Sequence, residues 1–84
     1  MPIKQANYRG MLIKAAAFEV VGRHRFIGSL LIAREGGTLG RAKLFEPPSE
    51  DGFFDDPEAA LKAGVAFARA IIDGEVAGLT VQDL

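Results

Sequence analysis

The sequence predicts an α+β fold in which an antiparallel sheet of three strands is covered on one face by a single C-terminal helix. Residues 55–74 carry the start and stop signals of a helix. Residues 24–34 form a long apolar run, which is typical of a central strand, and the runs before and after it alternate in polarity. The order strand, strand, strand, helix gives a two-layer meander with the helix across one face.

The chain of 84 residues is expected to form one domain, because a chain of this length leaves no room for a second core. Its composition, 49% apolar and 25% charged, is ordinary for a globular protein. We expect a structured core over residues 8–74. Residues 75–84, where Leu79 and Val81 alternate with polar residues, are expected to form a docked tail or a short edge strand.

A cytoplasmic location is expected from the composition. The chain has no cysteine, which excludes disulfides, thiolate zinc sites and cysteine nucleophiles, and fits a reducing compartment. The strongest apolar run, residues 26–33, is far shorter than the roughly 20 residues that cross a bilayer. Lys14 and Glu19 interrupt the only segment that resembles a signal peptide. We therefore expect no membrane partner.

Residues 1–7 are polar and are expected to be loose. From Tyr8 to Val21 the alternation of apolar side chains predicts a first strand, with Gly10 as a bend and a bulge near the three alanines 15–17. The same apolar residues also fall at helical spacing, and alanine favours a helix. A helix over residues 8–20 is therefore the alternative.

A turn at Gly22 and Arg23 leads into the predicted middle strand, residues 24–34. Both faces of this strand are apolar, with Phe26, Leu30 and Ile32 on one and Ile27, Leu31 and Ala33 on the other. Because one helix covers only one face of a sheet, the other face needs a second cover. The candidates for that cover are the tail, the N-terminus and a second copy of the chain, and a homodimer through the open sheet face or its edge is therefore a hypothesis.

Residues 35–38 predict a hairpin loop and residues 39–45 a third strand that is half exposed. Its alternation places Ala42 and Leu44 on one face and Arg41 and Lys43 on the other. If Leu44 faces the helix, the two cations lie on the uncovered face. The next segment, residues 46–55, is a loop by its proline, glycine and acidic content, with Phe53 or Phe54 packing on the first helical turns.

The helix is the most firmly predicted element. Asp56 is a suitable N-cap, Pro57 suits the first helical position, Glu58 complements the helix dipole, and Gly74 suits the left-handed conformation after the last turn. The predicted buried arc holds Leu61, Gly64, Val65, Phe67, Ala68, Ile71 and Ile72, opposite a stripe of Glu58, Lys62, Arg69 and Asp73.

The net charge of −1 hides an uneven distribution. Residues 1–45 carry eight basic and two acidic side chains, whereas residues 46–84 carry two basic and nine acidic ones. This split favours pairing of a basic sheet with an acidic loop and helix, and the alternative is a polyanion partner. The candidate contacts for single-stranded nucleic acid are Lys14, Arg23, Arg25, Arg41 and Lys43, with Tyr8 or Phe26 for stacking on bases.

No catalytic, cofactor or metal site is predicted. His24 is the only histidine, which excludes a Ser/His/Asp triad and any site with two histidines. The acidic residues Glu50, Asp51, Asp55 and Asp56 match no calcium-loop spacing, and Asp56 serves as the helix cap. They are interpreted as solvated loop charges. We expect no enzymatic activity and no small-molecule substrate.

Several local patterns resemble a known group of proteins. They are Tyr8-x-Gly10 opening a first strand, an aromatic just before the helix, and a helix that ends in Ile71-Ile72-Asp73-Gly74. Over residues 8–74 these patterns resemble short bacterial proteins of unknown function whose strand-strand-strand-helix domain is similar to the double-stranded-RNA-binding fold. The resemblance implies a fold and no activity.

True double-stranded-RNA binders place lysines at the start of the final helix, where the dipole helps to hold phosphate. Here this helix begins with Asp55 and Asp56, which would repel phosphate. The single-stranded-DNA-binding transcription coactivators are the closer analogy among nucleic-acid binders. The sequence thus predicts a non-enzymatic interaction module that forms a homodimer through its sheet, and single-stranded nucleic-acid binding is the alternative.

Overall fold

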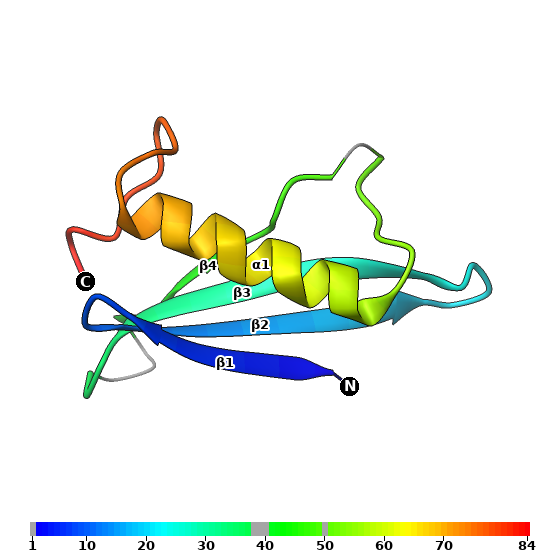
Figure 1. Cartoon of the computed structure of the whole chain (residues 1–84), viewed down its shortest axis with the longest axis horizontal. Coiled ribbons are helices and arrows are strands. Elements are labelled where there is room, and N and C mark those ends of the chain that lie inside the picture. The colour runs from blue at the N-terminus through cyan, green and yellow to red at the C-terminus, as the bar shows by residue number, and fades with distance from the viewer. Residues whose placement is uncertain (1, 38–40, 50) are drawn as a thin grey trace.

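The computed structural model describes residues 2–37, 41–49 and 51–84 of the chain. Its elements are β1 (Ile3–Tyr8), β2 (Met11–Val20), β3 (Arg25–Arg34), β4 (Lys43–Phe45) and α1 (Pro57–Ile72). The strands form one antiparallel sheet in the order β1-β2-β3-β4, and α1 lies across one face of it (Figure 1). The predicted α+β class is confirmed, although the sheet has one strand more than expected.

The extra strand comes from the segment that was expected to be loose. Residues 3–8 pair with residues 11–16 in a tight hairpin, so the predicted loose N-terminus and the predicted helical alternative over residues 8–20 are both wrong. Arg9 and Gly10 have φ values of 50° and 77°, and a two-residue turn with two positive φ values matches the twist of paired strands. Gly10 therefore reverses the chain rather than bending one long strand.

The β2–β3 hairpin forms the centre of the sheet. Its pairing runs without interruption from Met11 opposite Arg34 to Val20 opposite Arg25, so the expected bulge near the alanines is wrong. No bulge is needed, because the chain has already reversed at Gly10 and each strand is only ten residues long. The predicted turn at residues 22 and 23 is confirmed, and His24 belongs to it rather than to the strand.

The last strand is shorter than predicted, and its faces are reversed. Within the described residues it covers only Lys43–Phe45, and residues 38–40 of the predicted hairpin and strand lie outside the described part of the chain. Lys43 pairs with Ile32, which is buried under the helix, whereas Leu44 pairs with Leu31 on the other face and is 72% exposed. The prediction that Lys43 lies on the uncovered face is therefore wrong.

The helix has the predicted caps. The side chain of Asp56 accepts a hydrogen bond of 2.7 Å from the backbone N–H of Ala59, and Pro57 is the first helical residue. After the last turn, Gly74 has a φ of 77°, and the N–H groups of Gly74 and Glu75 donate to the carbonyls of Ile71 and Ala70. No helix in the described ranges is long and apolar enough to cross a membrane.

The core lies between α1 and the two central strands. On the helix side it is built from Ala60, Leu61, Gly64, Val65, Ala68 and Ile71, and on the sheet side from Met11, Ile13, Ala15, Ala17, Leu30 and Ile32. The predicted buried arc is thus confirmed, except that Phe67 and Ile72 are only partly buried and Ala60 was missed. A Cβ on Gly64 would lie 3.1 Å from that of Ala15, so this glycine sets a close approach of helix and sheet.

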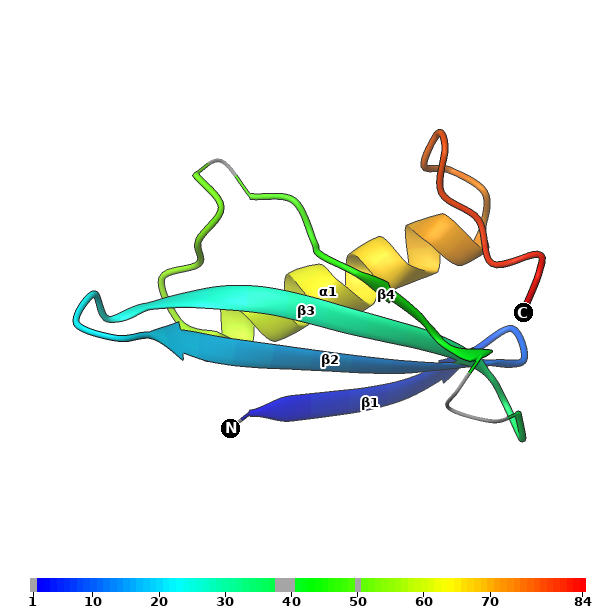
Figure 2. The same cartoon turned by 180° about the vertical axis from the view of Figure 1, so that it is seen from behind.

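The described part of the loop, residues 46–49 and 51–55, lies on the same side of the sheet as the helix (Figure 2). Phe54 exchanges two backbone hydrogen bonds with Phe26, of 2.8 and 2.7 Å, and its ring packs on the core. Pro47 is buried against Gly28, where a Cβ would come within 2.8 Å of the proline ring. The expected aromatic anchor before the helix is therefore Phe54, which also pairs with an edge of the sheet.

The C-terminal tail, residues 75–84, packs against the rest of the protein. All ten residues are described, and none of them belongs to a strand. Val81 is only 5% exposed, and Val76, Leu79 and Leu84 are partly buried against the core. Like the loop, the tail lies on the helix side of the sheet (Figure 1). The tail therefore does not cover the second face of the sheet, and no other described segment covers that face.

Leu61→Ala should lower the free energy of unfolding by about 2–4 kcal/mol, because it removes a side chain that is 4% exposed from a closely packed helix–sheet contact. Lys62→Ala, on the exposed side of the same turn, should change it by less than about 0.5 kcal/mol. Urea unfolding followed by circular dichroism measures both values. Equal effects at the two positions would contradict the assigned buried side.

Candidate functional site

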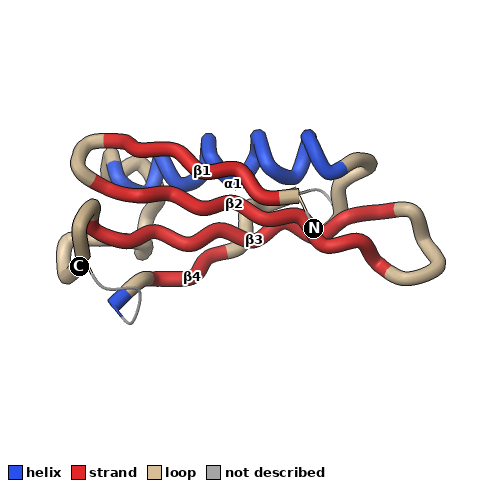
Figure 3. The backbone as a smooth tube through the Cα atoms, turned by 90° about the horizontal axis from the view of Figure 1, so that it is seen from below, coloured by secondary structure: helices blue, strands red, loops and turns tan. Residues whose placement is uncertain are grey.

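The face of the sheet opposite α1 is covered by no described helix, loop or tail segment (Figure 3). We call it the open face. The register places the odd-numbered residues of β1 and β3 and the even-numbered residues of β2 on this face, together with Leu44 of β4. Its apolar members are Ile3, Leu12, Ala16, Phe18, Val20, Ile27, Leu31, Ala33 and Leu44. Sequence reasoning predicted an apolar second face only for the middle strand.

Large apolar side chains on this face are exposed to solvent. Ile3 is 58% exposed, Phe18 45%, Ile27 39% and Leu44 72%. Lys14 lies among them, half-buried between its neighbours on β1 and β3, and Gln5 and Ser29 are the polar residues beside it. A sheet face with this composition is typical of a surface that contacts another molecule, because isolated apolar residues are common on surfaces but contiguous groups are not.

The candidate nucleic-acid contacts do not form one surface. Arg25 is engaged by the acidic loop: its guanidinium forms ion pairs with Asp51 at 2.5 Å and with Asp55 at 3.3 Å, and stacks on the ring of Phe53. The Arg25 hydrogen bond lowers the pKa of the Asp51 carboxyl from its ordinary value of 3.8, and the backbone N–H of Phe53 adds to this effect.

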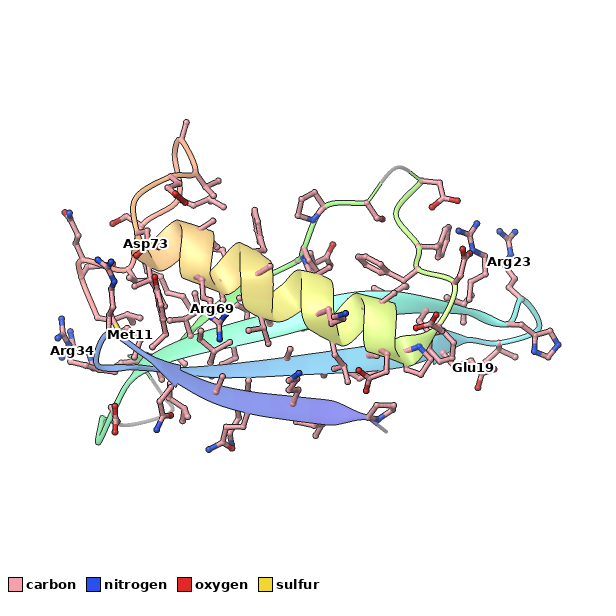
Figure 4. All side chains as sticks on the ribbon, viewed as in Figure 1. Met11, Glu19, Arg23, Arg34, Arg69 and Asp73 are labelled. Carbon is pink, nitrogen blue, oxygen red and sulfur yellow. The ribbon has the colours of Figure 1, made fainter. Side chains whose placement is uncertain are left out.

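Arg41 and Lys43 hold the C-terminal tail. The ammonium group of Lys43 donates to the carbonyl of Thr80 at 3.0 Å and forms an ion pair of 2.6 Å with Asp83. Arg41 donates to the carbonyl of Asp83 at 3.4 Å. At the same end of the sheet, Arg34 donates to the carbonyl of Leu84 (Figure 4). These cations serve the fold in this structure.

The two remaining candidates lie far from these pairs. Arg23 is exposed in the β2–β3 turn, at the opposite end of the molecule from Arg34 (Figure 4). Lys14 lies in the middle of the open face. The expected stacking residues Tyr8 and Phe26 are on the helix side, where they pack against the core. Phe18 is the exposed aromatic of the open face, and the sequence reasoning did not select it.

The ion pairs connect the basic half of the chain with its acidic half, as the charge split predicted. Arg25 binds Asp51 and Asp55, Lys43 binds Asp83, and Arg9 binds Asp73 at 3.2 Å. Asp73 also accepts a hydrogen bond of 2.7 Å from the hydroxyl of Tyr8. This cluster ties the end of α1 to the β1–β2 turn. In the sequence, the feature that points to this cluster is Tyr8, which directly precedes the β1–β2 turn.

The side chains that were considered for catalysis lie in two places, the β2–β3 turn and the acidic loop before α1. His24 is exposed in the β2–β3 turn and lies 4.0 Å from Glu19. Asp51, Asp55 and Asp56 line a shallow pocket of about 380 Å³ beside the first turn of α1, together with Arg25 and the two phenylalanines. Within the described ranges, no group of three or more potential metal ligands is close enough to hold an ion, and Glu50 lies outside them.

Comparisons with protein-family models, with curated proteins and with solved structures gave no match to this chain. The resemblance to short bacterial proteins with a fold similar to that of double-stranded-RNA-binding domains therefore stays a prediction. The open sheet face, with its exposed apolar side chains, is therefore the candidate functional surface, rather than the acidic pocket.

Docking of the tail should weaken at low pH. The hydrogen bond from Lys43 lowers the pKa of Asp83 from its ordinary value of 3.8, so the stabilisation is present above that value and is lost as the pH falls through the lower value in the folded protein. Amide chemical shifts of Val81 and Gln82, followed by NMR from pH 7 to pH 2, should report the release.

Asp83→Asn should shift the same amides at pH 7 toward their positions in the acid form of the wild type. Glu75→Gln is the matched control, because Glu75 is exposed and forms no ion pair with the described residues. Identical tail spectra for the wild type and Asp83→Asn at pH 7 would contradict the role of the Lys43–Asp83 pair.

Proposed function

We propose that this protein is a non-enzymatic interaction module that forms a homodimer through the open face of its sheet. The observation that carries the proposal is the exposure of Ile3, Phe18, Ile27 and Leu44 on one continuous face that neither the helix, the loop nor the tail covers. Two such faces, packed about 10 Å apart, form a sandwich in which the apolar side chains interdigitate. The cytoplasm is the compartment that we expect for it.

The size of the face suits a specific dimer. With a rise of about 3.3 Å per residue and about 4.8 Å between strands, the face spans on the order of 450 Å² per chain. A face-to-face pair buries on the order of 1,000 Å² in total, close to the lower limit for a stable interface. The covered side of the sheet cannot supply a second interface of this kind, because α1 occupies it.

Lys14 is compatible with this arrangement. It lies among apolar neighbours, and its four-carbon stem can lie along them while the ammonium group reaches solvent or the side-chain oxygens of Gln5 and Ser29. Lys14 also disfavours other ways of packing the two sheets, because these would bury its ammonium group without a partner. It therefore makes the dimer more specific at some cost in affinity.

Single-stranded nucleic-acid binding through Lys14, Arg23, Arg25, Arg41 and Lys43 is the alternative function. It has less support, because Arg25 is paired with the acidic loop and both Arg41 and Lys43 contact the tail. Binding in this mode would have to use Lys14 and the exposed ring of Phe18 on the open face. It would compete with the dimer for the same surface.

Phe18→Glu and Ile27→Glu should each convert the dimer into a monomer. Each substitution places two carboxylates per dimer in the interface, and an uncompensated buried charge costs about 3 kcal/mol or more. This corresponds to an increase of at least about a hundredfold in the dissociation constant. Analytical ultracentrifugation over a concentration series measures it, and circular dichroism should show an unchanged fold because both side chains are already partly exposed.

Val21→Glu is the matched control. Val21 is 96% exposed but lies in the β2–β3 turn, outside the paired part of the sheet, so its substitution should leave the dimer intact. A wild-type protein that stays monomeric at several hundred micromolar would refute the proposed dimer. If a mixed-sequence oligonucleotide then shifts the amides of Lys14 and Phe18, and the effect weakens steeply with salt, the alternative function is favoured.

A further inference from the structure

A shallow groove runs between the helix and the free edge of the sheet. It has a volume of about 230 Å³ and is lined by Lys4 and Ala6 of β1 and by Lys62, Val65, Ala66 and Arg69 of α1. Val65 and Ala6 are its more buried residues, and the three exposed cations are called its rim. The groove is on the helix side of the sheet and is separate from the open face described above.

The three rim cations have no counter-ion among the described residues. Lys4, Lys62 and Arg69 take part in none of the ion pairs that the other basic residues form with the acidic half of the chain. Arg69 points from α1 toward β1, and its guanidinium lies 5.5 Å from the centre of the Tyr8 ring (Figure 4). No acidic side chain is among the residues that line the groove, so the groove carries a local excess of positive charge.

The strand beside the groove has an unpaired edge. Among the described residues, β1 pairs only with β2. Hydrogen-bonded positions alternate along such an antiparallel pair. At one end of the β1–β2 hairpin the N–H of Ala17 donates to the carbonyl of Pro2, and at the other end a two-residue turn joins Tyr8 to Met11. The residues of β1 that are hydrogen-bonded to β2 are therefore the even-numbered ones. The backbone N–H and C=O groups of Ile3, Gln5 and Asn7 therefore point away from the sheet.

We propose that this edge binds an extended acidic peptide, which adds to β1 as a fifth strand. The backbone of the peptide pairs with Ile3, Gln5 and Asn7, and every second side chain then faces the groove. Acidic residues at these alternate positions meet the rim cations. Lys62 and Arg69 are about 10.5 Å apart along the helix axis. On a strand, side chains two or four residues apart are separated by about 7 or 13 Å, so two acidic side chains of the peptide can reach the two cations.

A second copy of this chain is a poor occupant of the edge. Pairing of β1 with β1 of another molecule would bring two sets of Lys4, Lys62 and Arg69 to the same groove, and like charges in such proximity are unfavourable. The edge therefore selects against self-association, whereas the open face favours it. An acidic partner relieves the repulsion among the three cations and satisfies the free backbone groups at once.

The test uses a blocked heptapeptide that alternates glutamate with threonine, added to the 84-residue chain at low salt. We expect hydrogen exchange to slow at the amides of Ile3, Gln5 and Asn7, and not at those already bonded to β2. The same peptide with N-methyl groups on the backbone edge that faces β1 should not bind. Binding of the N-methylated peptide with equal strength, or exchange that is unchanged at these three amides, would overturn the proposal.

Lys62→Glu should weaken peptide binding on the order of tenfold, because a charge reversal removes one attraction and adds one repulsion of similar size. Arg23→Glu, in the remote β2–β3 turn, is the matched control and should have no effect. If inorganic polyphosphate binds as tightly as the peptide and is equally sensitive to Lys62→Glu, the groove is a general anion site and the peptide proposal fails. Neither result depends on whether the open face forms a dimer.

Discussion

The close contact between α1 and the central hairpin determines the rest of the structure. Gly64 lies over Ala15, and small residues such as Ala17, Ala60 and Ala68 surround this contact, so the helix lies close to the sheet. A close helix fills the space above β2 and β3 with few side chains, which suits a chain of this size. It also concentrates all burial on one side, and the opposite face of the sheet is left with apolar residues in solvent.

Elements whose signals are local could be predicted from the sequence. The helix was placed correctly because its cap, its first proline and its terminal glycine each act within one turn. The middle strand and its turn were predicted because the apolar run is long and continuous. The N-terminal strand was missed because Lys4, Gln5 and Asn7 give it no apolar alternation, and its stability comes from pairing with β2 and from Ala6 and Tyr8 at the core.

The candidate site could be predicted only in part, since it depends on register. Which residues of β4 face the helix is decided by the pairing of Lys43 with Ile32, and this pairing cannot be read from a three-residue strand. A shift by one residue exchanges the two faces. The sequence therefore indicated that a second face needs a cover, but it assigned the cations to that face, whereas the structure places Leu44 there.

The uneven charge distribution has two consequences. Most of it is used within the molecule, because Arg9, Arg25 and Lys43 pair with carboxylates of the acidic half and thereby attach the helix end, the loop and the tail to the sheet. Among the cations that this pairing leaves over, Lys4, Lys62 and Arg69 share one groove, whereas Lys14 and Arg23 lie elsewhere. An internal role explains why the chain carries opposite charges in its two halves, but it does not explain a local excess at an unpaired strand edge. That excess disfavours pairing of the edge with a second copy of this chain, and it complements the charge of the acidic peptide that we propose as its partner.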